Sequence, residues 1–263
     1  MRVRNVWAKA FVATFGAYCL TQVVAVAARQ EPVKNVVLVH GAWADGSSWA
    51  KVVPLLEARG LHVVAVQNPL SSLADDVAAT QRAIDAQNGP VILVGHSYGG
   101  AVITEAGTNP KVARLVYVAA FGPDTGESVG STAKDFSPPP VAPEVKPIED
   151  NFVVLSRKGI TEDFAQDLTP TEKQVLAATQ APTSGSVFGA VIADAAWRHK
   201  PSWYVVAEND RMINPDYERF AAKRMGATTL ALPTSHVPML SKPEEVAAFI
   251  AEAAAGSAHP TMK

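Results

Sequence analysis

The sequence predicts an α/β domain with a mainly parallel sheet and helices on both of its faces. Two observations support this fold class. Apolar runs of strand length recur along the chain, among them Asn35 to His40 and Val112 to Ala119, and buried parallel strands have such sequences. Segments with helical spacing alternate with these runs across short turns, which is the order that builds a parallel sheet. The chain has 263 residues, of which 48% are hydrophobic and 18% charged, enough for one domain with a full core.

The first half of the chain contains regularly alternating strand and helix patterns. Gly60 is placed to end one helix as a C′ glycine, and Asn88-Gly89-Pro90 ends the next. The expected elements are strands at 35–40, 62–66, 91–94 and 112–119, with helices at 49–59, 71–88 and 100–109.

The alternation stops after Ala120. Residues 121–186 contain a Pro138-Pro139-Pro140 run and short polar stretches, and such a long irregular insertion in a compact domain is typical of a lid. A solvated loop without function is the alternative. One helix is expected after Thr169, where Pro170 takes the first position and Glu172 completes a capping box.

The alternation resumes at residue 202 and runs to the end of a domain predicted over residues 33–256. A capping box formed by Ser241 and Glu244 is expected to open the last helix, which ends near Ala255. The other expected elements are strands at 202–207 and 228–232 and a helix at 214–224.

The first 28 residues have the pattern of an export signal peptide. Arg2, Arg4 and Lys9 precede an uncharged stretch that ends in Ala25-Val26-Ala27-Ala28, a suitable cleavage site. We therefore expect a periplasmic or secreted protein with no stable membrane association after cleavage. The uncharged stretch is close to spanning length, so an uncleaved membrane anchor is the alternative.

The formal net charge is -2 without a long basic run, which argues against nucleic acid as a partner. The sequence leaves the oligomeric state open.

A nucleophile is predicted in Gly95-His96-Ser97-Tyr98-Gly99. This G-x-S-x-G pattern lies between an apolar strand and a helix, which is the context of a nucleophile elbow with Ser97 at its tip. A serine hydroxyl needs a base to remove its proton and an acid to orient that base.

The base is predicted to be His236, in the loop after the last strand. Loops that follow parallel strands share one edge of the sheet, so His236 is expected near Ser97, and histidine titrates near working pH. The acid is predicted to be Asp210, after the strand that ends at Ala207, with Asp124 and Glu208 as alternatives. The resulting order of serine, aspartate and histidine is that of α/β-hydrolases.

Two backbone N–H groups are predicted to bind the oxyanion of an acyl-transfer reaction, those of Ala42 and Tyr98. Tyr98 follows the nucleophile, and Gly41 allows the loop after the first strand to turn its amides toward the site. Trp43 and Phe188 are candidates for an apolar substrate pocket, with core packing as the alternative.

The chain resembles the α/β-hydrolase superfamily, and within it the small esterase-like branch of plant methylesterases and hydroxynitrile lyases. The likeness covers about residues 33–255. This chain differs from those proteins in two places. They have a second His-Gly where this chain has Ala44-Asp45-Gly46, and an export signal is not a feature of them. The residues that carry it are His40-Gly41-Ala42-Trp43, Gly95 to Gly100, Asp210 and Ser235 to Pro243.

The resemblance implies a Ser97–Asp210–His236 triad without cofactor or metal, beneath a cap. The predicted activity is hydrolysis of small-molecule carboxylic esters through an acyl-enzyme. The alternatives are a lyase or cofactor-free oxygenase on the same scaffold, or a ligand-binding homologue without catalysis.

Overall fold

The computed structural model describes Met1 and residues 33–256. The predicted export signal over residues 1–28, Met1 apart, lies outside the described residues, as does Cys19. Within the described part of the chain, no helix is both long and apolar enough to cross a membrane.

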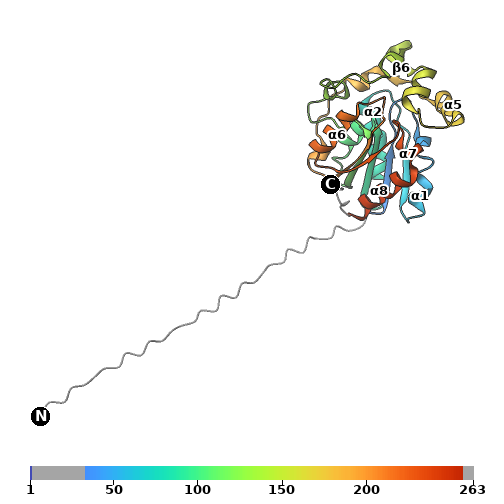
Figure 1. Cartoon of the computed structure of the whole chain (residues 1–263). Helices are drawn as coiled ribbons and strands as arrows, with labels where there is room; N and C mark the ends of the chain where they lie inside the picture. Colours follow the sequence, from blue (N-terminus) through green and yellow to red (C-terminus); the bar gives the residue numbers. More distant parts are fainter. Residues whose placement is uncertain (2–32, 257–263) are drawn as a thin grey trace.

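The core is a six-stranded sheet in the order β2-β1-β3-β4-β8-β9, with every neighbouring pair parallel (Figure 1). All residues of β1 and β3 are buried, because both faces of these central strands are covered. The predicted fold class is confirmed. The strands are β1 (Asn35–Val39), β2 (His62–Val66), β3 (Val91–Ser97), β4 (Val112–Ala120), β8 (Ser202–Ala207) and β9 (Thr228–Leu232).

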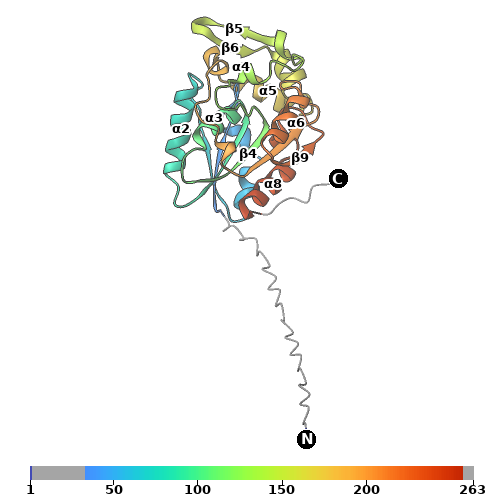
Figure 2. The ribbon, with the colours of Figure 1, turned by 90° about the vertical axis from the view of Figure 1, so that its left-hand side faces the viewer.

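Helices cover the sheet in two groups. Figure 2 shows α2 and α3 on one side of the sheet and α8 on the other, and α1 packs against α8. The helices of the core are α1 (Val53–Glu57), α2 (Leu73–Asp85), α3 (Gly99–Ala106), α6 (Pro215–Arg224), α7 (Pro238–Ser241) and α8 (Pro243–Ala255).

Two helix starts differ from the prediction. The helix expected at 49–59 is divided into a 3₁₀ turn, Gly46–Trp49, and the short α1, because Pro54 lacks an N–H and fits only the first helical turn. The predicted capping box at Ser241 is wrong. Ser241 ends α7, and its Oγ donates to the Val237 carbonyl at 3.1 Å, while Lys242 precedes α8 without a side-chain cap.

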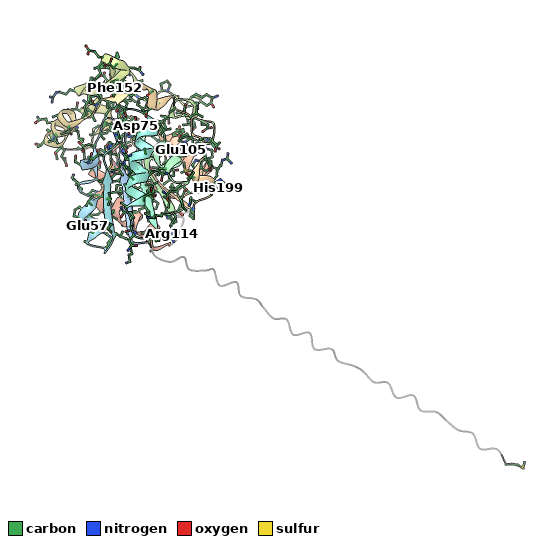
Figure 3. The ribbon with its side chains drawn as sticks, turned by 180° about the vertical axis from the view of Figure 1, so that it is seen from behind. Glu57, Asp75, Glu105, Arg114, Phe152 and His199 are labelled. Atoms are coloured by element: carbon green, nitrogen blue, oxygen red, sulfur yellow. The ribbon has the colours of Figure 1, made fainter. Side chains whose placement is uncertain are left out.

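A cap lies between β4 and β8, at one end of the central sheet (Figures 1 and 2). Figure 3 places Phe152 of the cap and Arg114, near the start of β4, at opposite ends of the molecule. The carboxyl ends of the parallel strands therefore point toward the cap. Its elements are α4 (Val129–Thr132), α5 (Pro170–Thr179), a π-helix (Gly159–Phe164), and an antiparallel sheet of β5 (Val145–Pro147), β6 (Phe152–Leu155) and β7 (Thr183–Ser184).

The α5 helix begins as predicted. Thr169 Oγ1 accepts from the Glu172 N–H while Glu172 accepts from the Thr169 N–H, which closes the capping box. The π-helix and the small sheet have no counterpart in the predicted elements.

Candidate active site

Ser97 ends β3 in a left-handed backbone conformation with φ 55°, and α3 begins two residues later. Such a conformation costs a non-glycine residue about 1–3 kcal/mol. The glycines around Ser97 make the bend possible. A Cβ on Gly95 would lie 2.5 Å from the Gly99 carbonyl oxygen, and one on Gly99 would lie 2.7 Å from the Val39 and His40 oxygens. The predicted strand–turn–helix context is therefore present.

Asp210 and His236 meet through their side chains, which come from the loops after β8 and β9. His236 Nδ1 lies 2.6 Å from Asp210 Oδ2, and both side chains are fully buried. Asp210 Oδ1 accepts from the Met212 and Ile213 N–H groups at 2.6 and 3.0 Å. A carboxylate at Nδ1 makes that nitrogen the donor and leaves the lone pair on Nε2. In the described part of the chain, His236 Nε2 has no hydrogen-bond partner.

His96 connects the His236 loop to the elbow. Its Nε2 bonds the His236 carbonyl oxygen at 2.8 Å, and the two rings lie 4.7 Å apart. Burial lowers the pKa of His96 well below its usual value, so the ring is neutral and Nε2 is the donor. His236, the predicted base, is therefore held against the residue that precedes Ser97. The sequence placed His96 in the elbow but carried no signal for this contact.

The loop after β1 passes directly over the serine. A Cβ on Gly41 would lie 2.6 Å from Ser97 Cβ, so only glycine allows this approach. His40 fixes the loop: its Nδ1 donates to the Gly41 oxygen at 2.8 Å and its Nε2 accepts from the Asn68 N–H at 2.9 Å. Burial lowers the pKa of His40, which keeps the neutral form that both bonds require. Ala42, the predicted oxyanion donor, is buried immediately after this glycine.

Trp43 joins the core to the cap. Its backbone has φ 56°, and it donates two hydrogen bonds to the cap sheet. The Trp43 N–H donates to Thr183 Oγ1 and its Nε1 to the Val153 oxygen, both at 3.1 Å. Phe188, the other pocket candidate, packs against Trp43 in a tilted arrangement with ring centroids 5.6 Å apart, and its centroid lies 6.3 Å from that of Tyr98.

The two alternative acids lie elsewhere. Asp124 pairs with Arg198; partial burial acts to raise the Asp124 pKa, but hydrogen bonds from Arg198 and Thr125 outweigh it and lower the pKa. Glu208 is 43% exposed and lies 3.9 Å from Arg219. Neither forms a hydrogen bond or ion pair with His236 in the described structure.

Glu218 is a buried acid that the sequence did not single out. It lies on α6 with no exposed surface, and its Oε2 accepts from the Ala207 N–H at 2.9 Å. Burial, and then the neighbouring Asp210 carboxylate, raise the pKa of Glu218 well above its usual value. Glutamate is common on exposed helix faces, so the sequence carries no signal for its burial. Among the described residues, no group of three or more His, Cys, Asp or Glu side chains could hold a metal ion.

The model of the Alpha/beta hydrolase family matches residues 36–249, and the chain belongs to that family. Methylesterase 2 of Arabidopsis thaliana is 26% identical over 242 residues, covering 80% of this chain and 92% of that protein. The pyrethroid hydrolase of Sphingobium wenxiniae is 29% identical over 261 residues, covering 84% and 87%. The predicted family resemblance is confirmed, and the chain is a hydrolytic enzyme of this family.

Solved structures agree with the fold. Polyneuridine aldehyde esterase superposes with a TM-score of 0.72 at 19% identity, covering 84% of this chain and 99% of that chain. A pyrethroid hydrolase from Sphingobium faniae JZ-2 superposes with a TM-score of 0.71 at 24% identity, covering 84% and 97%.

Proposed function

We propose that this protein is a serine hydrolase that cleaves small-molecule carboxylic esters through an acyl-enzyme. The observation that carries the proposal is the buried 2.6 Å contact between His236 Nδ1 and Asp210, which leaves His236 Nε2 as an unpartnered base beside the elbow. The names of the relatives, a methylesterase and a pyrethroid hydrolase, support esters as the substrate class.

In the proposed mechanism, Ser97 Oγ attacks the ester carbonyl carbon while His236 Nε2 takes its proton. Asp210 holds the imidazole in the required tautomer and stabilises its cation. The N–H groups of Ala42 and Tyr98 bind the oxyanion, each contributing about 3 kcal/mol. His236 then protonates the leaving alcohol. Water, deprotonated by His236, cleaves the acyl-enzyme and releases the carboxylic acid and free Ser97.

We further propose that residues 121–186 form a lid over this site. Val153 and Thr183 of that segment bond Trp43, one residue after the proposed oxyanion donor. Trp43 and Phe188 then contribute to an apolar pocket for the acyl or alcohol group, where burial of apolar surface favours binding by about 25 cal/mol per Å².

The test is a panel of p-nitrophenyl esters of increasing acyl length, run on wild type and Ser97→Ala. Wild type should release p-nitrophenol together with the free carboxylic acid, and the variant should lose on the order of 10⁴-fold or more in kcat. Activity retained in Ser97→Ala would refute the covalent mechanism. Turnover without a carboxylic acid product would point instead to lyase or oxygenase chemistry.

Export is the remaining proposal, and it rests on the sequence of residues 1–28. Mass spectrometry of the protein from its own host should find a mature start near Ala28 or Arg29. An intact Met1 in a soluble cytoplasmic fraction would contradict it.

A further inference from the structure

A five-residue stretch of the cap, here called the cap bracket (residues 163–167), reaches down to the two loops that carry Asp210 and His236. It begins in the last turn of the π-helix Gly159–Phe164, and π-helical turns are frequent at functional sites. Its three polar contacts with these loops are Asp163 Oδ1 with Arg211 Nε at 2.7 Å, Gln166 Nε2 with the Asn209 oxygen at 2.7 Å, and Asp167 Oδ2 with the Ser235 N–H at 2.8 Å.

The partners of the cap bracket adjoin the acid–base pair on both loops. Asn209 and Arg211 are the residues on either side of Asp210, and Ser235 directly precedes His236. Between these contacts, Phe164 is buried and packs edge-on against His236, with ring centroids 5.3 Å apart. The bracket therefore contacts both loops and the imidazole ring of His236.

We propose that the cap bracket positions the Asp210–His236 pair for catalysis. This inference rests on the proposed function and deepens it: the cap is part of the acid–base machinery as well as its cover. Proton transfer requires His236 Nε2 and Ser97 Oγ to come within hydrogen-bond reach of each other, and a displacement of about 1 Å in such a group can cost about 100-fold in rate.

Asp167 is the best residue for a test. Its side chain is exposed and accepts a hydrogen bond from the Ser235 N–H, so its loss should leave the core intact. A carboxylate that accepts a backbone N–H forms a strong, charge-assisted bond. Asparagine at this position keeps one oxygen acceptor, whereas alanine removes it. Asp163, in contrast, is a buried charge paired with Arg211, and its removal would also affect folding.

The first measurement compares kcat and KM for Asp167→Ala, Asp167→Asn and Glu162→Ala. Glu162 is the matched control, an exposed acid on the π-helix where the bracket begins, without a hydrogen bond to either loop in the described structure. Asp167→Ala should lower kcat on the order of 10-fold with little change in KM. Asp167→Asn should recover most of that loss, and Glu162→Ala should equal wild type.

The second measurement needs no turnover. The proton shared by His236 Nδ1 and Asp210 over 2.6 Å should give a downfield ¹H NMR signal, which we expect to shift or broaden in Asp167→Ala but not in Asp167→Asn or Glu162→Ala. Gln166→Leu, which removes the contact with the Asn209 oxygen, provides a second variant if Asp167→Ala folds poorly, with the same expectation.

The outcomes separate the two proposals. Wild-type kcat and an unchanged NMR signal in both Asp167→Ala and Gln166→Leu would overturn the positioning role, even if Ser97→Ala is inactive. Full activity in Ser97→Ala would overturn the proposed function, while the NMR signal would still report whether the bracket holds the pair.

Discussion

The carboxylate of Asp210 accepts from the Met212 and Ile213 N–H groups and faces His236 Nδ1. Asp210→Asn offers an amide in place of one carboxylate oxygen, which favours the wrong tautomer of His236. We therefore expect a loss on the order of 10⁴ in kcat with the fold retained. Asp124→Asn, which only breaks the pair with Arg198, is the control and should change kcat little. Steady-state kinetics with circular dichroism checks both, and the reverse ranking would assign the acid to Asp124.

Glu218 makes folding depend on pH. Its pKa in the folded protein lies well above the value of 4.5 expected when unfolded, so the folded state holds a proton that the unfolded chain releases. The stabilisation from this proton is complete below about pH 4.5 and is lost as the pH rises toward the folded pKa.

Glutamine at position 218 keeps the acceptor for the Ala207 N–H and does not titrate. Between pH 5 and 8, the unfolding free energy of wild type should therefore fall relative to that of Glu218→Gln. Urea unfolding at both pH values measures it, and parallel pH dependences would show that Glu218 is ionised in the folded protein.

At the scale of one element, the stability of α5 depends on the contacts at its N-terminus, because none of its residues is buried. Glu172 closes the capping box with Thr169 and also bonds Lys51 of the core at 2.6 Å. The hydrogen bond from Lys51, followed by those from Thr169, lowers the pKa of Glu172 to about 2. Both partners of the ion pair are partly exposed, so water and salt weaken it. The hydrogen bonds of the capping box therefore contribute more to the stability of α5 than the ion pair does.

Glu172→Ala should therefore loosen α5 without unfolding the core. A lost helix cap costs about 1 kcal/mol, so amide hydrogen exchange over residues 170–179 should rise several-fold while exchange in β3 and β4 stays slow. Lys51→Met removes the ion pair and the bond from Lys51 to the Leu240 oxygen but keeps the capping box, and it should have a smaller effect. Equal exchange in wild type and Glu172→Ala would contradict this account of α5.

Elements with local signals were predictable from the sequence, and elements held by distant contacts were not. The strands β2, β8 and β9 match the predicted ranges, and α6 begins after its Asn214 cap. The Ser241 capping box failed because Pro243 sets the helix start one residue later. In the cap sheet, β6 pairs with the distant β7, Phe152 with Ser184, and no short pattern encodes such a contact.

At the scale of the whole molecule, parallel strands bring the ends of β1, β3, β8 and β9 to one edge of the sheet. This rule allowed the sequence to predict that Asp210 and His236 meet. It could not predict the contacts that hold them from outside the sheet: His96 to the His236 oxygen, Glu218 behind Asp210, and the cap bracket. Those depend on side-chain directions that only the packed fold defines.

The central claim is that Ser97 and His236 act as one unit, and a double-mutant cycle tests it most directly. Members of such a unit are non-additive, so Ser97→Ala, His236→Ala and the double variant should fall to similar low values of kcat. Some activity above the uncatalysed rate should remain in each, because the Ala42 and Tyr98 N–H groups still favour the oxyanion. Losses that multiply in the double variant would mean that the two residues act independently, and would contradict the proposed mechanism.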